Sequence, residues 1–297
     1  MNYSLIKQLS KGKFFIYHAT AMNEVIPVFN ALNGGSYMAR PETLGIKLYN
    51  DKAEESINNK DSKIEQDSIA MIPLHGSMLK NGTLCSYGTS EIASMMLEIA
   101  KEKNVTGIIL DIDSGGGAVD SVAPLVDVIK KIQSDFNKPV VALCDLCASA
   151  AYWVACACDK IIASNNISAE FGSIGVMMSF MDVKPFYEKQ GYVFHEIYSN
   201  LSTEKNDTFR KALNGEYEKI KTEELDPLAL QFRQSVLKLR NGKFIADTDE
   251  ANLKGKTYFA DKAKELGMID IIGNADVAIA EIKRLSNKYI INNYLNN

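Results

Sequence analysis

Short apolar runs alternate with amphipathic stretches between residues 68 and 164. The runs 105–113 and 138–145 are almost continuously apolar, as expected of parallel strands that are buried on both faces. Helical patterns lie between such runs, as in 89–103, where apolar residues recur at three- and four-residue spacing. Strands that alternate with helices through short connections predict an α/β fold built around a parallel sheet.

The pattern continues beyond this region with weaker signals. It predicts further elements, in chain order a strand at 171–178, a helix at 183–191, a strand at 192–199, a long helical region at 208–240 broken near Pro227, and a turn, short helix and closing strand at 251–273.

A polar stretch without periodicity covers residues 54–68 and predicts a linker. We therefore expect three parts. Residues 1–67 form an N-terminal appendage that ends in the polar linker, 68–285 form the main domain, and 286–297 form a C-terminal tail.

The composition limits the classes of function. The chain has 297 residues, is 46% hydrophobic and 24% charged, and carries a formal net charge of −4. Without a basic excess, we expect no nucleic-acid partner. The sequence has no apolar run of 18 residues, so no membrane anchor is expected. Five cysteines, an odd number, together with no recognisable secretion signal, favour reduced thiols and a cytoplasmic location.

Four of the cysteines fall within the segment CDLCASAAYWVACACD, residues 144–159. Four sulfur atoms so close in sequence raise the question of a zinc site. However, Cys144 belongs to a predicted strand, and Cys156 and Cys158 lie two residues apart on a predicted helix, so their side chains diverge. We therefore expect buried thiols, no bound metal and no cofactor.

Ser149 lies in the same segment, where the predicted strand meets the predicted helix. A serine in this position can simply cap the helix. A glycine-rich turn, Ser114–Gly117, follows the neighbouring strand and is expected at the same sheet edge, where ligands of parallel sheets bind. The backbone N–H of Gly116 or Gly117, with that of Ala150, could then form an oxyanion hole for a reaction at Ser149.

Other hydrolytic sites have less support. The G-x-S-x-G motif of α/β-hydrolases is absent. His18, His75 and His195 are the only histidines, and none is paired in the local sequence with both an acid and a nucleophile. His75 and His195 nevertheless stay open as general bases.

Three motifs together resemble the signal peptide peptidase A family, serine peptidase family 49, and its phage prohead and capsid maturation protease relatives. They are SGGG (114–117), CASAAYWVACACDKIIAS (147–164) and FGSIGVMM (171–178), in the family's order. The resemblance extends from residue 68 to about residue 283. It implies a Clp protease/crotonase-like spiral of ββα units and a serine endopeptidase with a Ser–Lys dyad.

Within this resemblance, Ser149 is the nucleophile. Lys205, 56 residues later in IYSNLSTEKNDTF, matches the family's lysine base, and Ser173 is a supporting residue that could hydrogen-bond the lysine. The sequence departs from the family in two places. Gly115 replaces the usual proline, and the usual glycine and histidine near the lysine are absent.

The resemblance also implies a polypeptide substrate and a homo-oligomer, a ring or dome, in which neighbouring subunits can share a dyad. The expected absence of an anchor favours a phage-type enzyme that processes capsid or scaffold polypeptides in a prohead, over a signal-peptide-like substrate. Two alternatives remain open: a non-catalytic oligomeric scaffold component of the same fold, favoured by the altered loop around Lys205, and an acyl-CoA enzyme of the crotonase fold.

Overall fold

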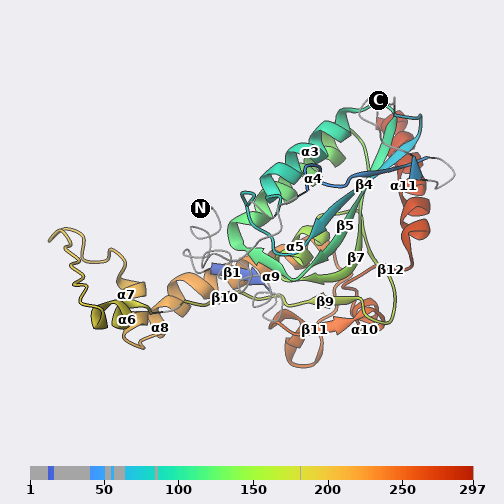
Figure 1. Cartoon of the computed structure of the whole chain (residues 1–297). Helices are drawn as coiled ribbons and strands as arrows, with labels where there is room; N and C mark the ends of the chain where they lie inside the picture. The colour runs from blue at the N-terminus through green and yellow to red at the C-terminus, as the bar shows by residue number, and fades with distance from the viewer. Residues whose placement is uncertain are drawn as a thin grey trace.

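A computed structural model describes residues 13–16, 41–50, 55–56, 64–83, 86–180 and 182–296. Its centre is a parallel sheet of β4 (Ser68–His75), β5 (Val105–Ser114) and β7 (Val140–Ala148) (Figure 1). β5, the middle strand, is buried along most of its length, which explains its continuous apolar sequence. The predicted α/β class with a parallel sheet is confirmed.

The sheet divides at β7. The first half of β7 pairs with β8 (Lys160–Ala163), which continues to β12 (Ile271–Ile272). The last residues of β7 pair instead with β9 (Glu170–Gly172), which is flanked by the antiparallel strand β11 (Thr257–Phe259). The end of β7 is therefore held between β5 and β9, and this end leads directly to Ser149.

Two shorter groups of strands extend this arrangement. At the opposite edge of the main sheet, β2 (Lys47–Tyr49) pairs antiparallel with β4, and β3 (Glu55–Ser56) pairs with β2. A separate three-stranded sheet has the order β10–β1–β6, made from Met177–Met178, Lys13–Ile16 and Gly116–Ala118. Both pairings of β1 are antiparallel.

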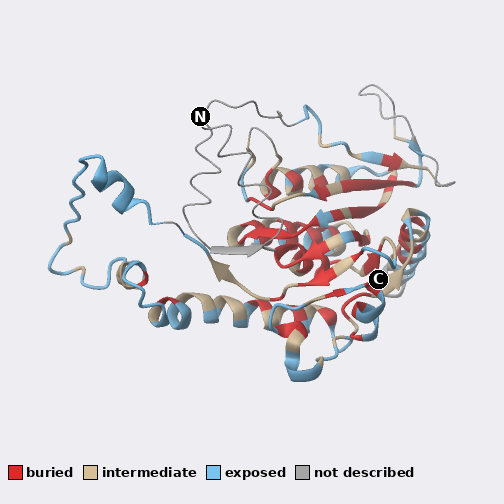
Figure 2. Ribbon diagram, turned by 60° about the horizontal axis from the view of Figure 1, so that its bottom comes forward, coloured by how far each residue is buried: buried red, intermediate tan, exposed pale blue. Residues whose placement is uncertain are grey.

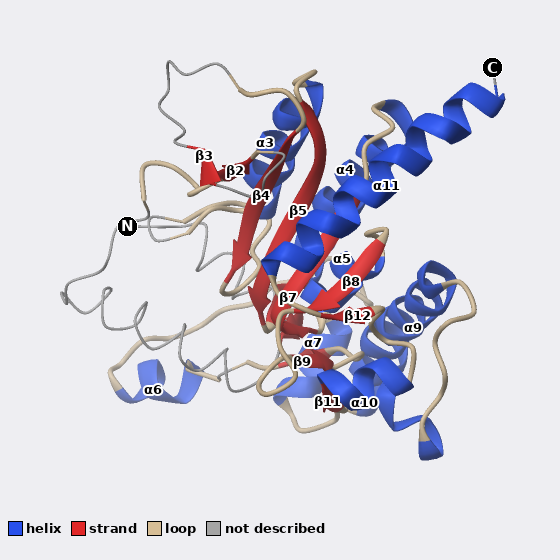
Figure 3. Cartoon of the chain, turned by 90° about the vertical axis from the view of Figure 1, so that its right-hand side faces the viewer, coloured by secondary structure: helices blue, strands red, loops and turns tan. Residues whose placement is uncertain are grey.

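Helices cover both faces of the main sheet (Figure 3). On one face, α3 (Thr89–Lys101), α4 (Val122–Asp135) and α5 (Ala150–Cys156) bury the larger apolar cluster. On the other face, the long helix α11 (Ala275–Asn296) packs its apolar residues on the strands. The remaining short helices of the body are η1 (Val119–Ser121), η3 (Thr248–Leu253) and α10 (Ala260–Glu265).

An arm extends from this body and is exposed along much of its length (Figure 2). We use "arm" for residues 180–225. It contains α6 (Lys184–Lys189), α7 (Asp207–Leu213), α8 (Glu218–Ile220) and a π-helical turn, η2 (Lys221–Leu225). Helix α9 (Asp226–Arg240) leads back from the arm to the body, where Phe232, Val236 and Arg240 are buried.

An ion-pair cluster fixes the end of α9 to the sheet. The Arg240 guanidinium donates to Oδ2 of Asp270 at 2.9 Å, and Lys243 donates to Oδ1 at 2.7 Å. The backbone N–H of Ile161 in β8 also donates to this carboxylate. Burial by itself would raise the pKa of Asp270, but the hydrogen bond and charge of Arg240, with help from Lys243, lower it to about 2. Asp270 therefore joins α9 to β8 as a charged group.

The structure also corrects several predicted elements. Residues 192–199 do not form a strand but an exposed irregular segment of the arm, and no strand within the described residues pairs with them. The predicted turn at 114–117 includes the start of a strand, β6, and the strand predicted at 171–178 is two strands separated by an irregular link. The division into an appendage, a main domain and a tail stays a prediction. Among the described residues, no helix has the length and apolar character needed to cross a membrane.

Candidate active site

Ser149 occupies a sharp turn between β7 and α5. Its backbone has φ 57° and ψ −120°, a combination that costs a residue with a Cβ on the order of 1–3 kcal/mol. The turn is held from both sides, because the Ser149 N–H donates to the Gly172 carbonyl at 2.8 Å and the Ser149 carbonyl accepts from Trp153 N–H at 3.1 Å. The side chain makes no hydrogen bond that caps α5. A strained strand-to-helix turn of this kind presents a side chain at a sheet edge rather than capping a helix.

Ser173 is joined to the same turn through the backbone. Its preceding residue, Gly172, supplies the carbonyl that accepts the Ser149 N–H. Gly172 has φ +127°, and a Cβ there would collide with the Lys256 carbonyl oxygen of the adjoining loop. Ser173 also has a positive φ, 53°, and its N–H donates to that Lys256 oxygen. The predicted supporting residue therefore lies directly after β9, the strand whose last carbonyl accepts the N–H of the predicted nucleophile.

The glycine-rich segment leaves the sheet beside Ser149. β5 and β7 run in register so that Ser114 lies opposite Cys147, two residues before Ser149. The Ser114 hydroxyl donates to the Gly76 carbonyl at 2.6 Å and accepts the Gly116 N–H at 3.1 Å. The Gly116 amide therefore has a partner within its own turn, which favours Gly117 among the two predicted oxyanion donors.

Gly117 is fixed by Met78, a residue whose importance the sequence did not reveal. Met78 N–H donates to the Gly116 carbonyl, and the Ala118 N–H donates to the Met78 carbonyl, both at 2.8 Å. A Cβ on Gly117 would collide with this Met78 carbonyl. The apolar run that ends in Gly-Ser-Met at residue 78 was the available signal, but only the fold brings Met78 against the glycines.

Ala150 is the first residue of α5 and is completely buried. The amide groups of a helix's first turn have no acceptor within the helix. The Ala150 N–H is therefore available as the second predicted oxyanion donor. Behind it, Trp153 stacks on Phe232 of α9, with ring centroids 4.7 Å apart, and the Tyr152 hydroxyl donates to the Met268 carbonyl at 2.8 Å. These contacts hold α5 rigidly beneath the turn.

Lys205 is not brought to Ser149 within this chain. It is an exposed residue of the arm, in the turn that precedes α7, and Figure 1 shows α6 and α7 well away from α5. The neighbouring carboxylates pair elsewhere, since Lys219 Nζ lies 2.8 Å from Glu204 and 2.6 Å from Asp207. Both carboxylates thus pair with Lys219 rather than with Lys205.

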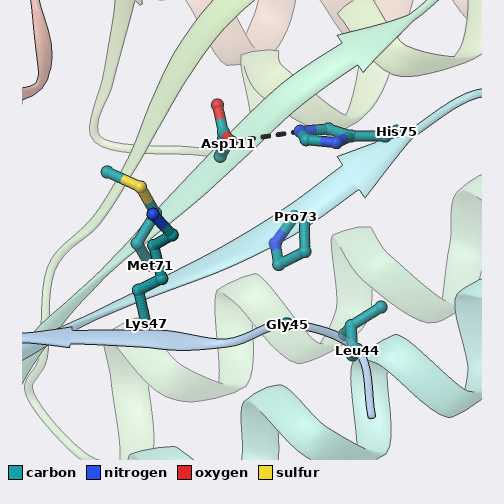
Figure 4. Close-up of a pocket in the computed structure, with 7 residues that line it drawn as sticks. All are labelled: Leu44, Gly45, Lys47, Met71, Pro73, His75 and Asp111. Atoms are coloured by element: carbon teal, nitrogen blue, oxygen red, sulfur yellow. Dashed lines mark hydrogen bonds and ion pairs between the residues drawn. The ribbon is translucent and has the colours of Figure 1, made fainter. Parts of the chain in front are cut away.

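The histidines lie apart from this arrangement. His75 Nε2 lies 3.0 Å from Oδ2 of Asp111, and this hydrogen bond raises the pKa of His75. The pair lines a pocket of about 310 Å³ on one face of the sheet, over β2, β4 and β5, together with Lys47, Met71 and other residues (Figure 4). His195 lies in the exposed segment of the arm that replaces the predicted strand, and His18 falls outside the described residues.

The four neighbouring cysteines are buried free thiols. Burial raises the pKa of Cys156 to about 12 and that of Cys144 and Cys158 well above the ordinary value. Within the part of the chain that the structure describes, no group of His, Cys, Asp or Glu side chains has the proximity needed to hold a metal ion. The thiols act as small apolar residues around α5.

Comparison with known families identifies the family of the chain. The model of the peptidase family described as "Peptidase family S49" matches residues 132–288, more than half of the chain. The chain belongs to peptidase family S49. The resemblance to signal peptide peptidase A and to phage proteases, inferred from the three motifs, is confirmed. The matched region includes Ser149, Ser173 and Lys205.

Among curated relatives, the chloroplastic serine protease SPPA of Arabidopsis thaliana is 28% identical over 75% of this chain and 33% of its own length. The head-tail preconnector protein GP5 of Enterobacteria phage P21 is 27% identical over 72% of this chain and 42% of its own length. The capsid assembly protease C of Escherichia phage lambda is 26% identical over 86% of this chain and 57% of its own length. The chain thus spans less than two thirds of each of these relatives.

Two solved structures align with most of the chain. A variant of the 1510-N membrane-bound stomatin-specific protease aligns with a TM-score of 0.44 at 13% identity, covering 73% of this chain and 84% of that one. An enoyl-CoA hydratase/isomerase family member aligns with a TM-score of 0.40 at 16% identity, covering 74% and 73%.

Proposed function

We propose that this S49 family member is a serine endopeptidase with Ser149 as its nucleophile, Lys205 as its general base and the amides of Gly117 and Ala150 as its oxyanion hole. The observation that carries the proposal is the left-handed turn at Ser149. A serine that only capped a helix would not need a costly backbone conformation, whereas a nucleophile at a sheet edge does. Ser173, directly after the adjoining strand β9, would orient the lysine.

In the proposed reaction, the Ser149 hydroxyl oxygen attacks the carbonyl carbon of a peptide bond while its proton passes to the Lys205 amine. The Gly117 and Ala150 N–H groups stabilise the resulting oxyanion. Collapse of this intermediate breaks the C–N bond, and the leaving amine takes the proton from the lysine. Water then hydrolyses the ester, which releases the new carboxyl group and restores the serine hydroxyl.

We further propose that Lys205 comes to Ser149 from a neighbouring subunit of a homo-oligomer, a ring or dome. A lysine in water is protonated at neutral pH, so it can act as a base only after burial lowers its pKa. The arm that carries Lys205 presents large exposed apolar side chains, which packing against a second copy would bury. They include Phe186, Tyr192, Val193, Phe194, Ile197, Leu201 and Tyr217.

The proposed substrate is an extended or unfolded polypeptide. The printed names of the phage relatives concern capsid assembly and the head-tail preconnector. By analogy, a capsid or scaffold polypeptide in a phage prohead is the first candidate substrate, with a signal-peptide-like cellular polypeptide in the cytoplasm as the second.

The test measures cleavage of an unfolded casein-like substrate by wild type, Ser149→Ala and Lys205→Ala, each in a matched oligomeric state. Both substitutions should abolish cleavage and leave assembly intact. The two inactive variants are then mixed under conditions that exchange subunits. For a dyad shared between subunits, about one quarter of the sites should regain both groups by random assortment, whereas a dyad within one subunit would regain none. Full activity of Lys205→Ala would show that the base is another residue, and an inactive wild type would favour the scaffold alternative.

A further inference from the structure

The N-terminal strand β1 lies between the two strands that leave the candidate active site. Residues 14–16 of β1 pair antiparallel with β6, and residues 13–14 pair antiparallel with β10. Figure 1 shows β1 beside β10, where the arm leaves the body. A segment more than 90 residues distant in sequence from either neighbour thus completes a small sheet.

Both neighbours of β1 follow closely in sequence on residues that lie beside Ser149. β6 begins two residues after Ser114, just as Ser149 follows Cys147, and Ser114 and Cys147 are opposite each other in register. β10 follows Ser173, whose preceding carbonyl accepts the Ser149 N–H. β6 also contacts α5. Both strands that pair with β1 are therefore connected through short segments to residues beside the Ser149 turn.

The backbone of β6 turns the candidate oxyanion donor toward β1. The Gly116 carbonyl and the Ala118 N–H both point to Met78. Because successive residues of a strand alternate in direction, the N–H and carbonyl of Gly117 point to the opposite side, where the register places Phe15. The chain's own backbone therefore covers the Gly117 amide.

We propose that Lys13–Ile16 is an internal pseudosubstrate, which occupies the strand position of a bound polypeptide and closes the site to other polypeptides until β1 leaves. The inference rests on the proposed function in treating this position as a substrate site, whereas the position of β1 between β6 and β10 does not depend on that function. An added strand with ladder pairing on both sides is a recurring mode of peptide recognition. The sequence of β1, Lys-Phe-Phe-Ile, indicates the ligand class: an extended peptide with consecutive apolar residues.

The first experiment measures binding, independently of catalysis. A fluorescent peptide that copies residues 11–18, KGKFFIYH, is titrated into the full chain carrying Ser149→Ala, with and without Phe15→Pro. Proline removes the N–H of residue 15 and is not tolerated in a strand paired on both sides. Because a tethered segment competes at an effective concentration on the order of millimolar, the peptide should bind about tenfold or more tightly after β1 is released. Equal affinities in the two backgrounds, or no binding to the Phe15→Pro chain, would overturn the proposal.

Controls separate this result from damage to the fold. Phe15→Ala keeps the backbone N–H and should change peptide affinity far less than Phe15→Pro, and a scrambled peptide should not bind. Hydrogen exchange at the Gly117 and Met177 amides should accelerate in Phe15→Pro while exchange in β5 stays slow. Unchanged exchange at Gly117 would show that β1 does not cover it.

A second experiment uses the active chain. In Phe15→Pro, the KM for an unfolded polypeptide substrate should fall about tenfold with little change in kcat. If the chain with Ser149 intact cleaves nothing in either form, the proposed peptidase activity fails. The binding measurement would still decide whether β1 occupies a peptide-binding position between β6 and β10.

Discussion

The body and the arm of this protein differ in how far their apolar side chains are buried. In the body, β5 and its neighbours bury nearly every apolar side chain. In the arm, Ile197 is 94% and Leu201 is 96% exposed, although both belong to a similarly apolar stretch. The candidate nucleophile belongs to the first region and the candidate base to the second. The contrast is the basis of our proposal that the arm packs against another copy of the chain, whereas the body buries its apolar residues by itself.

The largest expected effect is on the body, through the buried ion pair at the end of α9. Replacing Arg240, 3% exposed, with methionine leaves the Asp270 carboxylate without its principal partner. Such a change typically destabilises a protein by about 3–5 kcal/mol. Lys101→Met removes one side of an ion pair with Glu98 that is exposed on both sides, and should cost at most about 1 kcal/mol. Urea unfolding measures both, and equal losses would contradict the role of Arg240 as an anchor.

The next effect should separate activity from stability. Replacing Ile197 and Leu201 together with aspartate removes little buried area in the single chain, so the free energy of unfolding should stay within about 0.5 kcal/mol of wild type. Cleavage should fall about 100-fold or more, because the interface that delivers Lys205 is lost. Light scattering should show smaller assemblies at the same time.

The matched control is Lys189→Asp, a charged position of the same arm. It should leave assembly and cleavage nearly unchanged. Intact oligomers in the Ile197 and Leu201 double variant would show that the exposed apolar side chains serve another purpose.

A third prediction concerns acid. The pKa of Asp270 is lowered to about 2, against about 3.9 in an unfolded chain, so its contribution of about 2–3 kcal/mol is complete above pH 4 and is lost as pH falls toward 2. The difference in unfolding free energy between wild type and Asp270→Asn should therefore be constant from pH 5 to 8 and should narrow in acid. A gap that changes near neutral pH would identify a different titrating group.

The smallest effect should come from His75. Its hydrogen bond to Asp111 raises its pKa, so the stabilisation is complete below about pH 6.5 and is lost as pH rises through the folded value. Because both side chains are partly exposed, the contribution should stay below about 1 kcal/mol. An NMR titration should show a higher His75 pKa in wild type than in Asp111→Asn, and equal values would contradict the pairing.

The contrast between body and arm also explains what sequence reasoning could recover. Strands such as β5 and β7 were predictable, because a strand buried on both faces must be apolar throughout. Residues 192–199 have a similar composition, but the predicted strand was wrong, and no strand within the described residues pairs with them. Periodicity records which side chains avoid water, and it cannot tell whether the same chain or another one covers them.

The candidate site also has a part that the sequence could predict and a part that only the fold reveals. Ser149, Ala150 and the glycine-rich turn at 114–117 could be placed together, because the ends of parallel strands share one sheet edge. The preference for Gly117 over Gly116 could not be predicted, since it depends on the Ser114 hydroxyl and on Met78. Short glycine-rich strands such as β6 have almost no apolar pattern, which is why the sheet with β1 was missed.

Helix α9 has a mechanical consequence. Arg240 at its C-terminal end is bonded to Asp270, which holds this end against the sheet. Phe232 in its middle stacks on Trp153 of α5, and its N-terminal end continues into the arm. Its 15 residues span about 22 Å, so a tilt of about 5° about Arg240 moves the N-terminal end at Asp226 by about 2 Å. The stacked rings of Phe232 and Trp153 lie roughly midway along α9. Any docking of the arm that tilts α9 would therefore also shift Trp153 of α5, the helix that begins directly after Ser149.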